Sequence, residues 1–119
     1  MRKMRQVRQG YIDGVVTIHE NKSGNVSSFN AIKNATSKAD LKQLVKLRYN
    51  VKTKRDTDLT YAEAHDRTLS LKIVTPYCKQ VEAAQYAITE DVLYTIYQVD
   101  PDQSEDCMYL YLEEVRKLS

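Results

Sequence analysis

The chain has little of what nucleotide-binding proteins and metalloenzymes use. Its 119 residues include no Trp, one Phe, three Gly, two Pro, two Cys and two His. With three glycines, no phosphate-binding loop can be drawn. His19 and His65 stand in no HExxH or HxH pattern, so we expect both to be exposed and no metal site to form. No run of 18 apolar residues is present, and no membrane-spanning helix is expected.

The cysteines and the N-terminus indicate where the chain resides. Cys78 and Cys107 lack the spacing that is typical of zinc sites, and we expect reduced thiols in a cytosolic protein, with a disulfide between them left open. The basic N-terminus is not followed by an apolar stretch. We therefore expect no secretory signal.

No set of side chains predicts catalysis. Glu63 lies close to His65 in the sequence, but no further ligand or base accompanies them. Asp102, Glu105 and Asp106 form an acidic segment without the central glycine of a calcium loop, and we interpret it as a solvated hairpin loop. The prediction is a protein that is not an enzyme and that needs no cofactor.

Charge is divided unevenly along the chain. Residues 1–55 hold thirteen Lys or Arg against three acids, a net charge of +10, whereas residues 56–119 hold five against thirteen, a net charge of −8. Such a division predicts one basic and one acidic surface on the folded protein. It favours a component that docks between other components over an enzyme.

Alternating apolar and polar residues dominate the chain. They predict strands over residues 15–19, 26–33, 45–54, 69–73, 85–89, 92–99 and 108–112. The first two would form a hairpin around 22–25, residues 90–91 would form a turn, and 100–102 would end the sixth strand. Leu41, Leu44, Val45 and Leu47 also fit helical spacing, which leaves a short helix before residue 45 as an alternative. Nine of the ten aromatic residues are Tyr, which suits half-buried sheet faces and interfaces.

These patterns predict an all-β or mainly β fold, a small antiparallel β-barrel or sandwich. Residues 1–9 would be a basic arm and 10–119 a single β domain. The polar stretch 53–66 is predicted to be an exposed loop with at most one helical turn, capped by Asp58 or Thr60. The predicted core face has six members: Leu69, Leu71, Ile73, Ile96, Leu110 and Leu112.

A basic run is the main signal for a nucleic-acid partner. Eight side chains fall within 23 residues: Lys33, Lys38, Lys42, Lys46, Arg48, Lys52, Lys54 and Arg55. Lys42, Lys46, Arg48 and Lys52 are the candidates for contact with DNA phosphates. Tyr49 is the only aromatic residue there that could stack on bases, so the alternatives are a solvated face or a contact with an acidic protein surface.

Three parts of the second half carry a family resemblance. The first, central part comprises residues 47–49 (LRY), 61–63 (YAE) and 67–76 (RTLSLKIVTP). The second is 92–100 (VLYTIYQVD), and the third is 109–113 (YLYLE). Their order and spacing, over about residues 45–117, resemble the head–tail joining proteins of long-tailed phages of Gram-positive bacteria. These are also called head-tail adaptor or head-closure proteins.

The resemblance implies a virion protein that is present in the host bacterial cytoplasm during assembly. It implies a small β-barrel with a long loop, and a ring of identical copies that closes the DNA-filled capsid. The implied partners are other copies, a portal or adaptor protein on the head side, a tail or tail-terminator protein on the other side, and packaged DNA without sequence preference; no membrane is implied. The expected assembly residues lie in the 53–66 stretch: Lys54, Arg55, Leu59, Tyr61 and Glu63. A tail-completion or tail-terminator protein and a non-specific nucleic-acid-binding β-domain are the alternatives.

Overall fold

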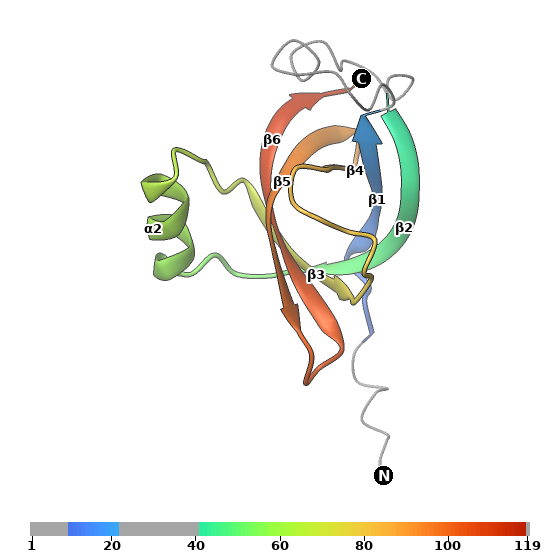
Figure 1. Ribbon diagram of the computed structural model, residues 1–119, viewed down its shortest axis with the longest axis horizontal. Coiled ribbons are helices and arrows are strands. Elements are labelled where there is room, and N and C mark those ends of the chain that lie inside the picture. The colour runs from blue at the N-terminus through green and yellow to red at the C-terminus, as the bar shows by residue number, and fades with distance from the viewer. Residues whose placement is uncertain (1–9, 22–40, 119) are drawn as a thin grey trace.

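Antiparallel strands close into a barrel in the computed structural model of the chain, which describes residues 10–21 and 41–118 (Figure 1). The ring order of the six described strands is β1-β2-β3-β6-β5-β4. The elements are β1 (Gly14–Asn21), β2 (Leu41–Val51), α2 (Asp56–Ala64), β3 (Leu71–Pro76), β4 (Tyr86–Thr89), β5 (Val92–Asp102) and β6 (Cys107–Lys117). The predicted mainly β barrel is therefore confirmed.

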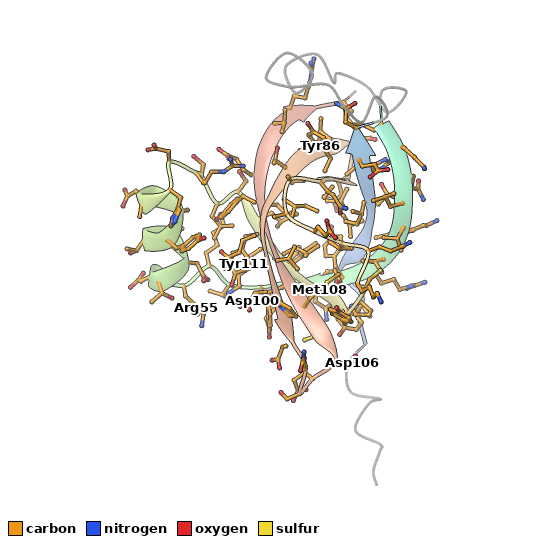
Figure 2. All side chains as sticks on the ribbon, in the orientation of Figure 1. Arg55, Tyr86, Asp100, Asp106, Met108 and Tyr111 are labelled. Carbon is orange, nitrogen blue, oxygen red and sulfur yellow. The ribbon has the colours of Figure 1, made fainter. Side chains whose placement is uncertain are left out.

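The alternation of residue types in β6 fixes which side of the sheet faces the core. Met108, Leu110 and Leu112 are fully buried inside the barrel, because successive side chains of a strand point to opposite faces. Tyr109 and Tyr111 point outward, and Figure 2 shows Tyr111 on the side of the sheet that faces α2. The sequence pattern predicted this division of β6 correctly.

The barrel core contains most of the predicted core residues. Its buried members are Val16, Ile18, Tyr49, Ile73, Val81, Ala87, Ile96, Met108, Leu110 and Leu112, and Leu71 is partly buried against them. Leu69 is also buried, but it packs outside the barrel with Ala62 and Tyr111. The core therefore forms as predicted, except that Leu69 anchors the helix rather than the barrel.

The hairpin between β4 and β5 confirms the predicted turn at residues 90–91. Glu90 and Asp91 have φ values of 52° and 62°, while Thr89 pairs with Val92. Positive φ at both central residues is the geometry of a type I′ turn, whose twist matches that of the flanking strands. Residues 103–106 connect β5 to β6, and Glu105 and Asp106 are exposed there, as expected of a solvated loop.

Several boundaries differ from the predictions. β2 begins at Leu41, which pairs with Asn21, so the alternative of a helix before residue 45 is wrong. β5 continues through Pro101 to Asp102, because the ladder with β6 extends to the pair Asp102–Cys107. Pro101 is tolerated because β4 pairs with β5 only over its first four residues, which leaves Pro101 on an edge.

His19 is a further correction, because it is buried rather than exposed. Its Nε2 atom lies 2.8 Å from the Thr17 hydroxyl. The predicted arm at residues 1–9, the predicted strand 26–33 and the connection 22–25 lie outside the described residues, as do Lys33 and Lys38.

Candidate assembly surface around helix α2

Residues 52–70, here called the insertion, leave the barrel between β2 and β3 and carry α2 to one side of it (Figure 1). The helix has nine residues, or about two and a half turns, so the expected limit of one turn is wrong. Arg55 is the N-cap residue, and its backbone N–H donates to Asp58 Oδ2 at 2.9 Å. Asp58 therefore stabilises the helix start from the third helical position and not as the cap itself. Its negative charge in the first turn also interacts favourably with the helix dipole.

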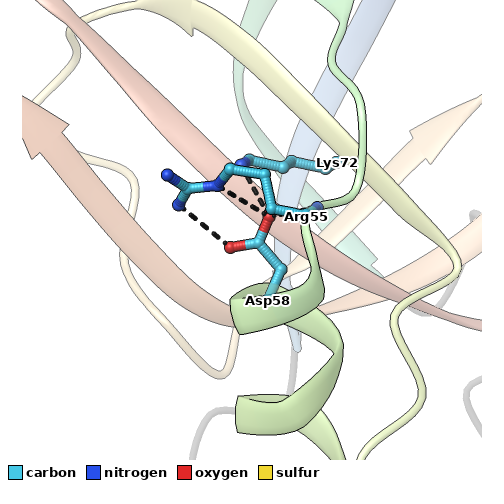
Figure 3. Close-up of polar contacts among 3 residues, drawn as sticks. All are labelled: Arg55, Asp58 and Lys72. Atoms are coloured by element: carbon cyan, nitrogen blue, oxygen red, sulfur yellow. Dashed lines mark hydrogen bonds and ion pairs between the residues drawn. The ribbon is translucent and has the colours of Figure 1, made fainter.

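An ion pair whose two side chains are both buried connects α2 to the barrel (Figure 3). Lys72 Nζ, from the outer face of β3, lies 2.8 Å from Asp58 Oδ2, and both side chains are 5% exposed. Arg55 Nη2 contacts the second carboxylate oxygen at 3.1 Å. The Lys72 ammonium also lies 5.5 Å and 5.3 Å from the ring centres of Tyr109 and Tyr111. These contacts hold the first turn of α2 against the sheet.

The environment of Asp58 favours its charged form. Burial by itself would raise the pKa of Asp58, but hydrogen bonds from Arg55 and Lys72 outweigh it and hold the pKa far below the ordinary value of 3.8. Asp58 is therefore ionised throughout the physiological range. The stability that its charge contributes is present above the unfolded-state pKa and is lost as the pH falls toward the folded-state pKa.

We expect this linkage to be visible in acid. In urea titrations between about pH 7 and pH 3, the wild type should lose stability below about pH 4 more steeply than Asp58→Asn, because only the wild type has this carboxylate to protonate. The difference between the two proteins isolates Asp58 from the other acids. Parallel pH profiles for the two proteins would contradict the assignment.

A second contact holds the far end of the insertion. Ala62, Leu69 and Tyr111 form a small buried cluster between α2 and the outer face of the sheet. Beside it, Arg67 Nε lies 2.9 Å from Glu113 Oε1 on β6. The insertion is thus attached at both ends of α2, which limits its freedom to move relative to the barrel.

A groove of about 450 Å³ lies on the outer face of the sheet, next to the buried ion pair. Cross-strand pairing aligns Lys72 with Tyr111 and Tyr109 with Asp100, so the two tyrosines form its floor. Its residues are Lys52, Thr53, Arg55 and Lys72 on one side, Asp100 and Asp102 on the other, and Tyr109 and Tyr111 between; Figure 2 shows Arg55, Asp100 and Tyr111 gathered there. Both signs of charge meet in this groove.

The phenols of the groove are neutral at physiological pH. Burial, followed by the charges of Asp58 and Asp100, raises the pKa of Tyr111, and burial is also the main cause that raises the pKa of Tyr109. Neither hydroxyl is therefore poised to accept a proton. The groove therefore combines charges of both signs with tyrosine rings, a side chain that is enriched at protein interfaces.

A second hollow, of about 620 Å³, lies along the exposed flank of α2. We call it the helix hollow; it is lined by Asp56, Leu59, Thr60, Ala62, Glu63, Arg67, Thr68 and Leu69. Asp56, Leu59, Thr60 and Glu63 follow the i, i+3, i+4, i+7 spacing that places residues on one helix face. Since Arg67 is paired with Glu113, the carboxylates of Asp56 and Glu63 dominate the charge of this hollow.

The five predicted assembly residues divide among these features. Leu59 and Glu63 line the helix hollow, and Arg55 joins the ion pair and the groove. Tyr61 lies on the other flank of α2, where its ring stacks on His65 at 4.1 Å between centres. Leu59 and Tyr61 are 45% and 42% exposed, and Lys54 is exposed without a place in either hollow.

The four candidate DNA-facing residues are all exposed along β2 and its extension. Lys52 lines the groove, whereas Lys42, Lys46 and Arg48, here called the basic ridge, lie on the strand itself. In the ring order β2 stands opposite β5, so the ridge faces away from the β5–β6 sheet. The ridge is therefore separated from the acidic residues of β5, but opposite charges also adjoin at the start of β2, where Lys42 pairs with the exposed Glu20 of β1. Seven of the thirteen basic residues of the N-terminal half lie outside the described residues.

Sequence reasoning missed Lys72 and the two tyrosines of the groove floor. Lys72 stands between Leu71 and Ile73 in an alternating strand, a position that predicts a solvated side chain. No local signal shows that a helix will cover it. Asp58 was the one available indication, and the sequence pattern predicted that it would cap the helix rather than pair with a residue on a strand.

No family model and no curated protein matches the chain. Over residues 10–21 and 41–118, no helix is long and apolar enough to cross a membrane. In the same part of the chain, no group of three or more His, Cys, Asp or Glu side chains could hold a metal ion. Cys78 and Cys107 are both free thiols, and burial raises the pKa of the Cys107 thiol.

Proposed function

We propose that the chain is a structural protein that joins a phage head to its tail. In this proposal it assembles as a ring below the portal, closes the DNA-filled capsid and provides the surface on which the tail docks. The observation that carries the proposal is the insertion, because a buried ion pair fixes it to the barrel while Leu59 and Tyr61 stay exposed. Because the helix is already held in place, these side chains can contact a partner without the cost of ordering a loop.

The charges of the described surface support assembly over turnover of a substrate. The groove brings lysine and arginine side chains close to aspartate and tyrosine side chains, a mixture that can bind charged side chains of either sign. Arginine and tyrosine are also the residue types that most often dominate binding energy at protein interfaces. A portal or adaptor protein on one side and a tail protein on the other are the proposed partners.

The exposed apolar residues of α2 provide the first test. We expect the double substitution Leu59→Ser and Tyr61→Ser to leave the fold intact and to reduce infectious particles by at least about 30-fold, because losing a contact worth about 2 kcal/mol weakens binding by that factor. Titre and electron microscopy of particles that carry the variant gene would measure the effect.

Tyr77→Ser is the matched control, since Tyr77 is similarly exposed but lies beyond β3 and outside the insertion. Circular dichroism would confirm that both variants are folded. A normal titre for the double variant would rule out α2 as an assembly element. Particles that accumulate as free tails, rather than as unjoined heads, would favour a tail-completion role.

The basic ridge favours a second candidate, a nucleic-acid-binding β-domain. Lys42, Lys46 and Arg48 are exposed on one strand, as phosphate contacts require. A salt-titrated DNA-binding assay separates the two functions, because non-specific contacts are weaker than about 1 µM at physiological salt. Tighter binding would favour the nucleic-acid function.

A further inference from the structure

We infer that the helix hollow of one copy binds the basic ridge of the next copy, which makes this pair of surfaces the contact that builds the ring. The inference rests on the proposed function and names the partner of the insertion as a second copy of this chain. Two surfaces of opposite charge and comparable extent carry it, one on α2 and one on β2.

The helix hollow is acidic with an apolar centre. Asp56 and Glu63 lie at its two ends, and the 45% exposed Leu59 lies between them. α2 carries no basic residue in its last turn. A partner for this surface must therefore supply positive charge together with some apolar contact.

The basic ridge supplies both. Arg48 pairs with Val15 across the β1–β2 ladder, and Val15 is 41% exposed. Lys46 pairs with Thr17 on the same ladder. Because cross-strand partners share a face of the sheet, Val15 stands beside Arg48 and gives the ridge an apolar contact that can meet Leu59.

The dimensions of the two surfaces agree. Residues 56 and 63 are separated by about 10 Å along a helix that rises 1.5 Å per residue. Residues 46 and 48 are about 7 Å apart along a strand, and the long Lys and Arg side chains can spread over the remaining distance. Each carboxylate of the hollow can thus receive one cation of the ridge.

The positions of the two surfaces lead to a ring rather than to a pair. α2 stands on one side of the barrel and β2 forms the opposite side (Figure 1), so the two surfaces of one copy cannot meet each other. A contact between two different surfaces is heterologous, and its repetition closes into a ring when the rotation between copies allows it.

A protein partner suits the ridge better than DNA does. The exposed aliphatic side chain of Val15 gains nothing from a phosphate backbone, and no aromatic side chain is exposed on the described face of β2 for stacking on bases. Opposite charges on the two surfaces would also guide and orient the encounter of copies.

Charge reversal on each surface tests the inference. The ridge variant carries Lys46→Glu and Arg48→Glu, and the hollow variant carries Asp56→Lys and Glu63→Lys. We expect wild-type protein to associate in low salt and to dissociate as salt is raised, when measured by sedimentation velocity over a series of concentrations. Each variant alone should associate at least about 100-fold more weakly, because it places like charges against each other.

The decisive sample is an equal mixture of the two variants. Its alternating copies restore opposite charges at every contact, so association should return to the wild-type level. The variant Arg116→Glu with Lys117→Glu changes the net charge as much as the ridge variant does, but at the exposed end of β6, and should associate as the wild type does.

Three results would overturn the inference: wild-type protein that stays monomeric at every concentration in low salt, a ridge variant that associates normally, or a mixture that stays dissociated.

A ridge variant that loses DNA binding but keeps self-association would assign the ridge to nucleic acid instead. Normal infectivity of the ridge variant, with the chain present in particles, would reject this contact and leave the proposed function standing. Absence of the chain from particles would reject the function and leave the solution contact in place.

Discussion

Replacing Asp58 with Ala is expected to lower the free energy of unfolding by about 3–5 kcal/mol, which is the usual cost of removing one partner from a buried ion pair. The reason is the position of Lys72, which is 5% exposed and would be left with an uncompensated charge beneath α2. Urea titration followed by circular dichroism would measure the loss. The apolar pair Asp58→Leu with Lys72→Met should recover most of it, because it removes both charges together.

Two outcomes would separate this explanation from a general sensitivity of the insertion. Asp56→Ala is the matched control, since Asp56 is an exposed aspartate two residues away in the same helical turn, and it should change stability by less than about 0.5 kcal/mol. A loss below about 1 kcal/mol for Asp58→Ala would contradict a buried pair and would instead fit a weak surface pair.

Leu110→Ala is expected to cost about 2–5 kcal/mol, because the substitution removes a fully buried side chain and leaves a cavity that the barrel can only partly fill. Leu110 pairs with Ile73 on β3 and with Val99 on β5, so the cavity would lie between three strands. Equilibrium urea unfolding would measure the change.

Leu59→Ala is the control for this measurement, because it removes the same atoms from an exposed position on α2. Its effect should stay within about 0.5 kcal/mol. If the two leucines cost the same, the assignment of Leu110 to the barrel core would be incorrect.

The strands that pack on the core were predictable because the sequence period determines which side of a strand is apolar. Met108, Leu110 and Leu112 alternate with Tyr109 and Tyr111, and this order alone places the first three in the barrel. The 90–91 turn was predictable for a similar reason, since it joins two strongly alternating segments. Both signals are local, and tertiary contacts reinforce them.

Helix α2 was underestimated because its stability is not local. A nine-residue helix is marginal by itself, and five of its nine residues are Asp, Thr or Tyr, which have weaker helix propensity. The ion pair to Lys72 and the buried Ala62 stabilise it through residues of β3 and β6. A partner on a distant strand leaves no trace in the local pattern of either segment.

The charge division predicted one basic and one acidic surface but not where on the fold they would lie. The separation of the basic ridge from the β5–β6 sheet depends on the ring order of the strands, which places β2 opposite β5. The groove, where Lys52 faces Asp100 and Asp102, depends on where β2 ends. Neither strand order nor strand ends can be inferred from composition.

The location and copy number of the chain in intact particles test the central claim most directly. Quantitative mass spectrometry of purified particles, and of separated heads and tails, would measure both. A ring predicts a small fixed number of copies in each particle, retained on filled heads that carry the portal. Particles that are complete and infectious without the chain would contradict the account.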